Sequence, residues 1–463
     1  MSHLVEVGKL VEYIVGEQIL EHFVTNNLFH PNHHGSLANH STATALIQLT
    51  DMWMQASEKK KLTGVCMIDQ SAAYDLLSHK ILTEKLKLYN FDEGTINWCK
   101  SYLGGRSQCV KVESKTSDYL ECEDNGAPQG SILAGLFHVI NSNDLPDCHE
   151  EGESVVYVDD DTDSVHADHP EQLVDKLQKE VNNTVSWLKD NRLCVAGDKS
   201  KLLIVAHQEL RKARLTDKLA IQVDGQRVEE TSSEKLLGLV INNKLTWKEH
   251  LYGDEDNPGL ISQLKQRLGT LKRLSKHMSR DRLKMMVSGI FYSKLMYCLP
   301  VFGNVHGLDI YRDTRGRSSG MTITDCNKLQ VLQNSVNRLI TGARQGTATA
   351  DLLENTKSLS VQQMIAFYTL IMVHKITMTG KPDYLAKRLS LRQENLRELR
   401  GWGGRTVETP DYSLETSRAG FVYRGGRLYN SLSRNLREEM AISKFKVGVK
   451  EWVKDKIPVK PAR

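Results

Sequence analysis

The segment 155–165 places four aspartates, Asp159, Asp160, Asp161 and Asp163, between two β-branched runs. This pattern predicts a β-hairpin with carboxylates at and beside its bend. Adjacent like charges repel each other, so such a cluster is stable only when it is well solvated or binds a hard cation through oxygen. Three interpretations are open: a solvated acidic turn, a calcium-binding loop, or half of a two-metal polymerase site.

The calcium-loop interpretation fails on spacing. Asp159, Asp161 and Asp163 do fall at loop positions one, three and five. However, the sixth position, which needs glycine, is Ser164, and the twelfth, which needs glutamate, is Pro170. A two-metal site instead needs a further carboxylate from a different strand.

Asp69 is a candidate for that further carboxylate. It follows the apolar run 65–68, which is compatible with a buried strand, and it precedes a segment with helical spacing. A strand that ends in Asp and turns into a helix presents the carboxylate at the end of a sheet, where ligands usually bind. Asp is also a common helix N-cap, and the two roles are compatible. Between Asp69 and Asp159, the glycines and proline of Gly126–Ser131 predict a tight turn into a helix.

Length and composition describe a globular protein of several domains. The 463 residues predict two to four domains, and 40% hydrophobic with 25% charged residues is typical of soluble chains. Lys and Arg number 61 against 57 Asp and Glu, which gives a net charge of only +4. A nucleic-acid-binding surface must therefore come from local clustering of basic residues.

The eight cysteines are scattered, and none forms a C-x2-4-C pair. This spacing argues against a structural zinc site and against a disulfide framework, and it suits a reducing compartment. Charges at Glu6, Lys9 and Glu12 interrupt the N-terminal segment, so no signal peptide is predicted. No apolar run approaches about 20 residues, so we expect no membrane span. The expected location is intracellular, in the cytoplasm or nucleus.

The segment Leu260–Met286 is the most basic stretch, because its only acidic residue is Asp281. Its apolar residues follow helical spacing, so one face is expected to pack and the other to be basic. This suits a subdomain that follows a nucleic-acid backbone through phosphate contacts. A solvated face and a membrane-surface helix are the alternatives. The residues that we assign to nucleic-acid binding are Lys265, Arg267, Lys272, Arg273 and Lys276.

Helical spacing also predicts helices over 4–26 and 41–61, with a His-rich loop between them. The loop histidines could be imagined as a metal site, but they lack an orienting helix and a regular spacing, so a loop is preferred. These histidines are His30, His33, His34 and His40. Residues 307–320 predict a polar linker, and residues 321–463 are expected to be mainly helical.

Three blocks, in this order, resemble the polymerase core of reverse transcriptases, specifically those of LINE-like, jockey-type non-LTR retrotransposons. Met67–Asp75 is similar to the motif D-x-S-x-A-[FY]-D, Gly126–Ser131 to G-x-P-Q-G-S, and Tyr157–Asp160 to the [FY]-x-D-D hairpin. The likeness continues along the chain. Further matches are Asn191–Val205, which resembles the motif after the hairpin, Lys235–Gly238, which resembles the x-Y-L-G primer-holding motif, and Leu245–His250, which matches L-[ST]-W-x-x-H.

The resemblance implies an α+β fold of the right-hand polymerase type. Residues 1–252 would form fingers and palm with an antiparallel sheet, 253–306 a helical thumb, 307–320 a linker, and 321–463 a mainly helical C-terminal domain. The implied activity is RNA-directed DNA polymerisation, in which dNTPs are added to a DNA primer 3′-hydroxyl on an RNA template.

The resemblance also assigns roles to individual residues. Two Mg2+ ions would be held by Asp69 and Asp159, with Asp160 assisting. Lys199 is the candidate proton donor to pyrophosphate, and a solvated turn lysine is the equal alternative.

Substrate contacts follow from the same motifs. Tyr74 stands where the family places an aromatic that excludes a ribose 2′-hydroxyl, which makes the product DNA. Gln129 and Gly130 would line the template and nucleotide pocket, with Ser71 beside them, and the primer-holding residues would be Leu237 and Gly238.

The chain departs from the family pattern in the segment 33–42, HHGSLANHST, where the family has Q-[HY]-G-F-R-x-G-[RH]-S-T. Leu37 replaces the expected arginine, and the chain begins where a W-R-P-I-S segment should be under way. The arginine replaced by Leu37 and the arginine of the W-R-P-I-S segment would together clamp the triphosphate. Their loss removes this clamp, which can change a rate by orders of magnitude. We therefore expect an N-terminally truncated polymerase region without an endonuclease domain. The alternatives are a catalytically impaired relic that only binds RNA or RNA–DNA hybrid, and a domain with a cellular partner.

Overall fold

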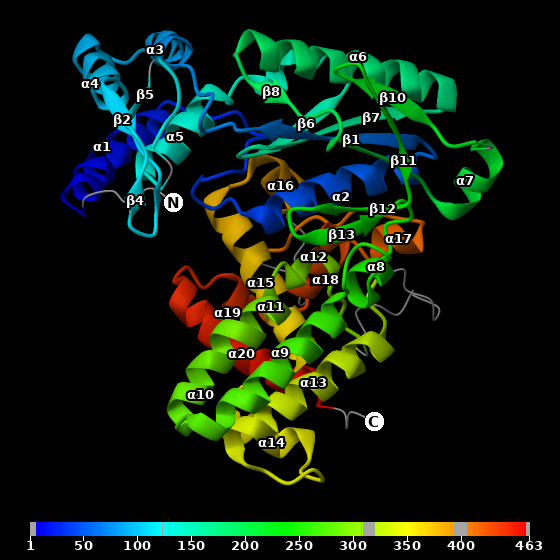
Figure 1. Cartoon of the computed structure of the whole chain (residues 1–463). Helices are drawn as coiled ribbons and strands as arrows, with labels where there is room; N and C mark the ends of the chain where they lie inside the picture. Colours follow the sequence, from blue (N-terminus) through cyan, green and yellow to red (C-terminus); the bar gives the residue numbers. More distant parts are fainter. Residues whose placement is uncertain are drawn as a thin grey trace. The chain divides into compact units, whose positions relative to one another are not determined.

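The computed structural model describes residues 6–122, 124–128, 130–215, 217–306, 308, 320–392 and 405–459 (Figure 1). Gln129 and nearly all of the predicted linker over 307–320 lie outside the described residues. Contacts divide the chain into two units. The first unit comprises Met1–Ser41, Leu62–Ile204 and Arg214–Thr231, and the second comprises Thr42–Lys61, Val205–Ala213 and Ser232–Arg463.

The first unit is built on a seven-stranded sheet in the order β10-β11-β9-β1-β7-β6, with β8 paired to the end of β1. The strands are β1 (Leu62–Ser71), β6 (Glu153–Tyr157), β7 (Asp160–Ala167), β8 (Cys194–Val195), β9 (Lys201–Val205), β10 (Ala220–Val223) and β11 (Gln226–Thr231). Only the β9–β11 pairing is parallel among those with a defined register. The apolar residues of β1 are buried along the strand because α6 (Pro170–Asp190) covers the sheet. Gly64 permits this close packing, since a Cβ there would lie 3.1 Å from a methyl of Leu177.

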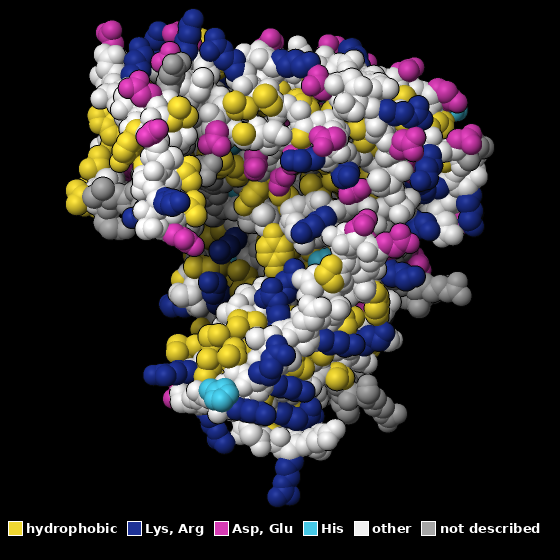
Figure 2. Space-filling model, in the orientation of Figure 1, with side chains coloured by type: hydrophobic (Ala, Val, Ile, Leu, Met, Phe, Trp, Pro, Cys, Tyr) yellow, Lys and Arg dark blue, Asp and Glu magenta, His cyan; other side chains and the backbone are white. Residues whose placement is uncertain are grey.

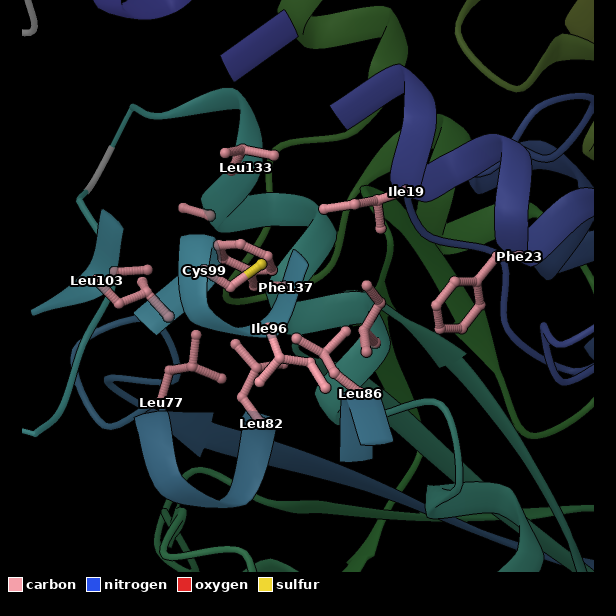
Figure 3. Packing of buried hydrophobic residues seen from close by; sticks show 13 residues of the cluster. Ile19, Phe23, Leu77, Leu82, Leu86, Ile96, Cys99, Leu103, Leu133 and Phe137 are labelled. Atoms are coloured by element: carbon pink, nitrogen blue, oxygen red, sulfur yellow. The ribbon is translucent and has the colours of Figure 1, made fainter. Parts of the chain in front are cut away.

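A helical layer of the first unit positions the 126–131 turn. It consists of α1 (Glu6–Thr25), α3 (His79–Leu88), α4 (Glu93–Leu103) and α5 (Ile132–Asn141), with the short helix η1 (Leu145–Cys148). Figure 3 shows buried side chains from these helices pointing toward one another, among them Phe23, Leu86 and Phe137. Short strands lie beside them: β2 (Arg106–Gln108), β3 (Lys111–Val112), β4 (Lys115–Thr116) and β5 (Leu120–Cys122).

The second unit is mainly helical and carries the small hairpin formed by β12 (Ser233–Leu236) and β13 (Leu239–Asn242). Its helices are α2 (Thr42–Glu58), α7 (Gln208–Arg214), α8 (Lys248–Tyr252), α9 (Leu260–Leu274), η2 (Ser275–His277), α10 (Arg280–Val287), η3 (Ser288–Tyr292), α11 (Ser293–Met296), α12 (Leu299–Phe302), α13 (Ile323–Thr341), α14 (Thr349–Thr356), α15 (Val361–Thr379), α16 (Asp383–Arg388), α17 (Glu415–Arg418), α18 (Phe421–Asn430), α19 (Arg434–Arg437) and α20 (Ile442–Lys456). Helices α13 and α15 each begin with a capping box and end at a left-handed glycine, which explains why they start and stop where they do.

The predicted α+β class, with an antiparallel sheet followed by helices, is confirmed. The helices expected over 4–26 and 41–61 are α1 and α2, and the His-rich segment between them is a loop. The basic segment 260–286 forms α9, the short helix η2 and most of α10. A new helix, α10, begins after Ser279, whose side chain accepts a hydrogen bond from the backbone of Arg282 and so caps it.

Among the described residues, one helical stretch, Arg280–Phe302, is long and apolar enough to cross a membrane, by length and composition alone. Its most apolar window is 44% buried within the protein. A single helix of this kind is weak evidence for a membrane span, because core helices of soluble proteins share the same length and composition.

Candidate active site

The predicted acidic hairpin is present, and its tip is a two-residue turn. Tyr157 pairs with Asp160, which leaves Val158 and Asp159 as the turn residues. Asp69, near the end of β1, is the direct cross-strand neighbour of Asp160. Two segments about 90 residues apart in sequence therefore bring Asp69, Asp159 and Asp160 together at one end of the sheet.

The charges at this sheet end are unbalanced. Asp160 is a surface residue, yet crowding of its carboxyl by protein atoms, followed by the charges of Asp159 and Asp69, raises its pKa to about 6. The nearest cation in the described structure is Lys199, whose Nζ lies 4.0 Å from Asp69 Oδ2. Lys199 sits in a turn after β8, and that turn is fixed to β1 because Ala196 N–H donates to Asp69 O at 2.9 Å. The Lys199 side chain is 65% exposed, so both interpretations made for it remain predictions.

These carboxylates do not form a complete metal cage. Within the residues that the structure describes, no three His, Cys, Asp or Glu side chains are grouped closely enough to hold an ion. A hard divalent cation of the Mg2+ type nevertheless needs only a few carboxylates, because it keeps several waters and takes phosphate oxygens from a substrate. Among the described residues, the ion pair at these carboxylates is that of Lys199 with Asp69, at 4.0 Å, and it leaves Asp159 and Asp160 available to a cation. The residues present therefore fit a divalent cation whose remaining ligands come from water and substrate.

Tyr74 and Ser71 lie beside the same carboxylates. Burial and the charge of Asp159 raise the pKa of Tyr74. The Tyr74 ring is half-buried and lies 5.3 Å from the ring of His138 on α5. Ser71 ends β1 two residues after Asp69 and so points to the same face of the strand.

The Gly126–Ser131 turn is fastened to the segment after β1. Gly126 N–H donates to Leu77 O at 2.8 Å, and Ala127 N–H donates to Tyr74 O at 2.9 Å. Gly126 and Gly130 have φ angles of 83° and 89°, which favour glycine over any other residue. Gln129 cannot be placed because it lies outside the described residues. The first two motifs of the sequence are thus adjacent in the fold.

The His-rich loop supports the hairpin through its backbone. Val156 N–H donates to Asn32 O at 3.0 Å, and His34 N–H donates to Val156 O at 2.8 Å. Burial lowers the pKa of His33 to about 3, so this imidazole is neutral, and its Nε2 lies 3.1 Å from Ser142 Oγ. The loop thus acts as a backbone support for β6.

Sequence reasoning missed a second acidic group, which lies on the opposite face of β7. Asp161 and Asp163 are buried there, and the side chains of His149 and Glu180 are buried with them. His149 Nε2 lies 3.0 Å from Asp163 Oδ1, and its Nδ1 lies 3.4 Å from Glu180 Oε2. Burial alone would lower the pKa of His149, but Asp163 outweighs it and raises this pKa to about 11. Strand alternation, which places Asp160 and Asp161 on opposite faces, is the signal that could have separated the two groups.

The primer-holding motif forms the tip of the β12–β13 hairpin in the second unit. Leu237 and Gly238 have φ angles of 44° and 81°, as a two-residue turn of type I′ requires. The Tyr297 hydroxyl donates to Leu237 O at 2.9 Å, and the Tyr297 ring lies against Gly238.

A pocket of about 370 Å³ lies beside this hairpin. Three cations line it, namely Lys235, Arg267 and Lys294, and none of its described lining residues is acidic. Burial, followed by the charges of Arg267 and Lys235, lowers the pKa of Lys294. The pocket therefore suits an anion, since a bound negative charge would relieve this repulsion.

The basic helix α9 has the amphipathic form that its sequence predicts. Ile261, Leu264, Leu268 and Leu271 are buried. Figure 2 shows Lys and Arg side chains gathered over the region of α9 and α10. Four of the assigned basic residues are exposed, namely Lys265, Lys272, Arg273 and Lys276. Arg267 is partly buried and donates to Ile290 O at 2.5 Å.

Residues 1–241 match the model of the family described as reverse transcriptase (RNA-dependent DNA polymerase), so the chain belongs to this family. Among curated relatives, it is similar to the RNA-directed DNA polymerase from mobile element jockey of Drosophila funebris, with 22% identity over 84% of this chain and 40% of the relative. It is also similar to the probable RNA-directed DNA polymerase from transposon BS of Drosophila melanogaster, with 24% identity over 80% of this chain and 39% of the relative. The predicted resemblance to non-LTR retrotransposon enzymes is confirmed, and the chain spans about two fifths of the length of these relatives.

Solved structures give a weaker likeness. A telomerase from Candida tropicalis, determined with a TWJ fragment of telomeric RNA, matches 75% of this chain and 56% of its own chain, at 14% identity and a TM-score of 0.39. A TM-score at this level does not by itself establish a shared fold.

Proposed function

We propose that the chain catalyses RNA-directed DNA synthesis by adding deoxynucleotides to the 3′-hydroxyl of a DNA primer on an RNA template. The observation that carries this proposal is the convergence of Asp69, Asp159 and Asp160 at one sheet end without a balancing cation at hydrogen-bond distance among the described residues. We take the cofactor to be Mg2+, which when bound activates the primer hydroxyl and neutralises charge on the triphosphate.

The chain's own residues have separate tasks in this mechanism. Asp69 and Asp159 would hold the Mg2+ ions, and Asp160 would assist them once its carboxyl is deprotonated. Lys199, which reaches the Asp69 carboxylate, supplies a proton to the departing pyrophosphate. Tyr74 occupies the space that a ribose 2′-hydroxyl would need, so deoxynucleotides are selected.

The second unit supplies contacts to the primer strand. Lys235, Arg267 and Lys294 converge on one pocket beside the Leu237–Gly238 turn, which supports phosphate binding there. The exposed basic residues of α9 extend this surface for the nucleic-acid backbone. The free cysteines of the chain support an intracellular location, in the cytoplasm or nucleus.

Primer extension on an RNA template with Mg2+ tests the proposal. Asp159→Asn is expected to reduce extension by roughly a thousandfold, because it removes a charge that acts directly on the reacting groups. Asp168→Asn is the matched control: it makes the same change at an exposed residue just beyond the far end of β7. Extension that is equal in both variants contradicts the mechanism.

The relic hypothesis has a different signature. It predicts no extension by the unsubstituted chain, together with salt-sensitive binding of an RNA–DNA hybrid. Hybrid binding measured at 50 and 200 mM salt, alongside the extension assay, separates the two functions.

A further inference from the structure

The tip of the acidic hairpin has a backbone conformation that its own sequence disfavours. Val158 has a φ of 61°, and β-branched residues avoid this left-handed region, so contacts from elsewhere must hold it. One such contact comes from the loop before α2. A Cβ on Gly35 would lie 2.5 Å from the Val158 nitrogen, so only glycine permits this approach.

His138 of α5 holds the tip through a hydrogen bond. Its Nε2 lies 3.1 Å from Val158 O, and because a carbonyl can only accept, Nε2 carries the proton and donates. Its Nδ1 is buried without a hydrogen-bond partner. An apolar side chain could fill the same space without leaving a nitrogen unsatisfied, so the bond to Val158 is what the imidazole adds.

The same ring also contacts Tyr74. The two ring centroids are 5.3 Å apart and the planes are inclined by 37°, which is a packed aromatic pair. His138 therefore touches the aromatic residue and the backbone next to Asp159 at the same time. Its own backbone is fixed in turn, since Ser142 Oγ donates to His138 O at 2.9 Å.

We propose that His138 is a positioning residue that sets the separation between the Tyr74 ring and the tip of the acidic hairpin, and thereby the discrimination between deoxyribonucleotides and ribonucleotides. This inference rests on the proposed function, in which Tyr74 excludes the 2′-hydroxyl. Without the bond to Val158, the ring pair and the tip are free to move apart, and the space that Tyr74 denies to a 2′-hydroxyl opens.

Two variants and a control test the role of the imidazole. His138→Leu removes the donor at similar size, and His138→Gln keeps a donor. Leu133→Ala is the control for lost stability, because Leu133 is buried on the same helix and packs beside Gly16 of α1. Two quantities are measured for each: the ratio of ribonucleotide to deoxynucleotide incorporation, and hydrogen exchange of the amides over 157–160.

In His138→Leu we expect the ratio of ribonucleotide to deoxynucleotide incorporation to rise about tenfold and amide exchange at the hairpin tip to increase. In His138→Gln we expect both quantities to return most of the way to their values in the unsubstituted chain. Leu133→Ala should lower thermal stability and leave the ratio unchanged. The inference is overturned if His138→Leu matches the unsubstituted chain in hairpin exchange, or if Leu133→Ala shifts the ratio equally. If the unsubstituted chain extends no primer, the proposed function fails, and the exchange measurement still decides whether His138 holds the tip.

Discussion

Strand β7 carries two acidic groups on its two faces, and they differ in how their charge is balanced. Asp160 belongs to the group with Asp69 and Asp159, which is open to solvent. Among the described residues, the cation within 4.0 Å of Asp69 is the exposed Lys199. Asp161 and Asp163 are buried on the other face with the cationic His149. Neighbouring residues of one strand therefore differ in charge balance: Asp160 has no buried counterion, whereas Asp161 and Asp163 have His149.

The comparison teaches that clustering of aspartates does not by itself identify a cation site. The buried group already contains its cation, and its remaining bonds are internal. Thr184 Oγ1 donates to Asp163 at 2.8 Å, and Ser154 donates to Asp161. Glu180 accepts backbone N–H groups from the 150–152 loop that leads into β6. This group thus fastens the base of the hairpin, while the open group at its tip is left available to a substrate-borne cation.

Removal of the His149 cation has the largest expected effect on stability. In His149→Leu, Asp163 and Glu180 stay buried without a cation, and loss of one partner of a buried pair costs about 3–5 kcal/mol. With the pKa raised from 6.5 to about 11, this contribution is complete below pH 6.5 and is lost as the pH rises toward 11. Urea unfolding at pH 6 measures it.

The control for this change is His277→Leu, which alters an exposed histidine and should shift stability by less than about 0.5 kcal/mol. A His149→Leu variant as stable as this control would show that the buried group does not depend on the cation.

The open group is expected to respond to pH through Asp160. Its carboxyl binds a cation only when deprotonated, and its pKa is raised to about 6, so at limiting Mg2+ extension should fall by about tenfold for each pH unit below 6. Extension rates from pH 5 to 8, with circular dichroism at each pH to monitor folding, check this. Asp160→Asn should flatten the profile, and an equally steep profile in that variant would assign the titration to another group.

The smallest loss of stability is expected for Asp161→Asn. Burial, and then the charge of Asp163, raises the pKa of Asp161 from 3.8 to about 8, so this carboxyl is mostly neutral at pH 7 and resembles the amide. Its contribution to stability is complete below pH 3.8 and is lost as the pH rises through 8. Because Asn does not ionise in the unfolded chain either, the variant should be at least as stable as the unsubstituted chain at pH 7 and should exceed it further at pH 9, as measured by urea unfolding. A loss at pH 7 as large as that of His149→Leu would refute a neutral Asp161.

The open group could be predicted from sequence because each of its members lies at or next to a strand end. Asp69 follows an apolar run and Asp159 lies in a turn between two β-branched runs, so local pattern alone places both at strand ends. Nothing local connects His149, which precedes β6, with Glu180 in the middle of α6. Their contact depends on how α6 packs over the sheet, which is a tertiary outcome that periodicity does not encode.

Other features were only partly visible in the sequence. The break between α9 and α10 had a local signal, since Ser279 followed by Asp281 in the first turn is typical of a helix start. The role of His138 had no local sequence signal, because the residue belongs to a continuous apolar helix and its hydrogen-bond acceptor is a backbone carbonyl 20 residues away.

The packing of α2 in the second unit limits where this chain can be truncated. Residues 42–61 interrupt the first unit in sequence but belong to the second. There Asp51 accepts from Arg388 at 2.8 Å, and Glu58 accepts from the backbone of Leu414 at 2.8 Å. A recombinant fragment ending at residue 241, where the family match ends, would keep this helix and discard the segments that cover it. We expect such a fragment to aggregate on expression, and we expect limited proteolysis of the whole chain to leave residues 42–61 associated with the C-terminal segment of the second unit.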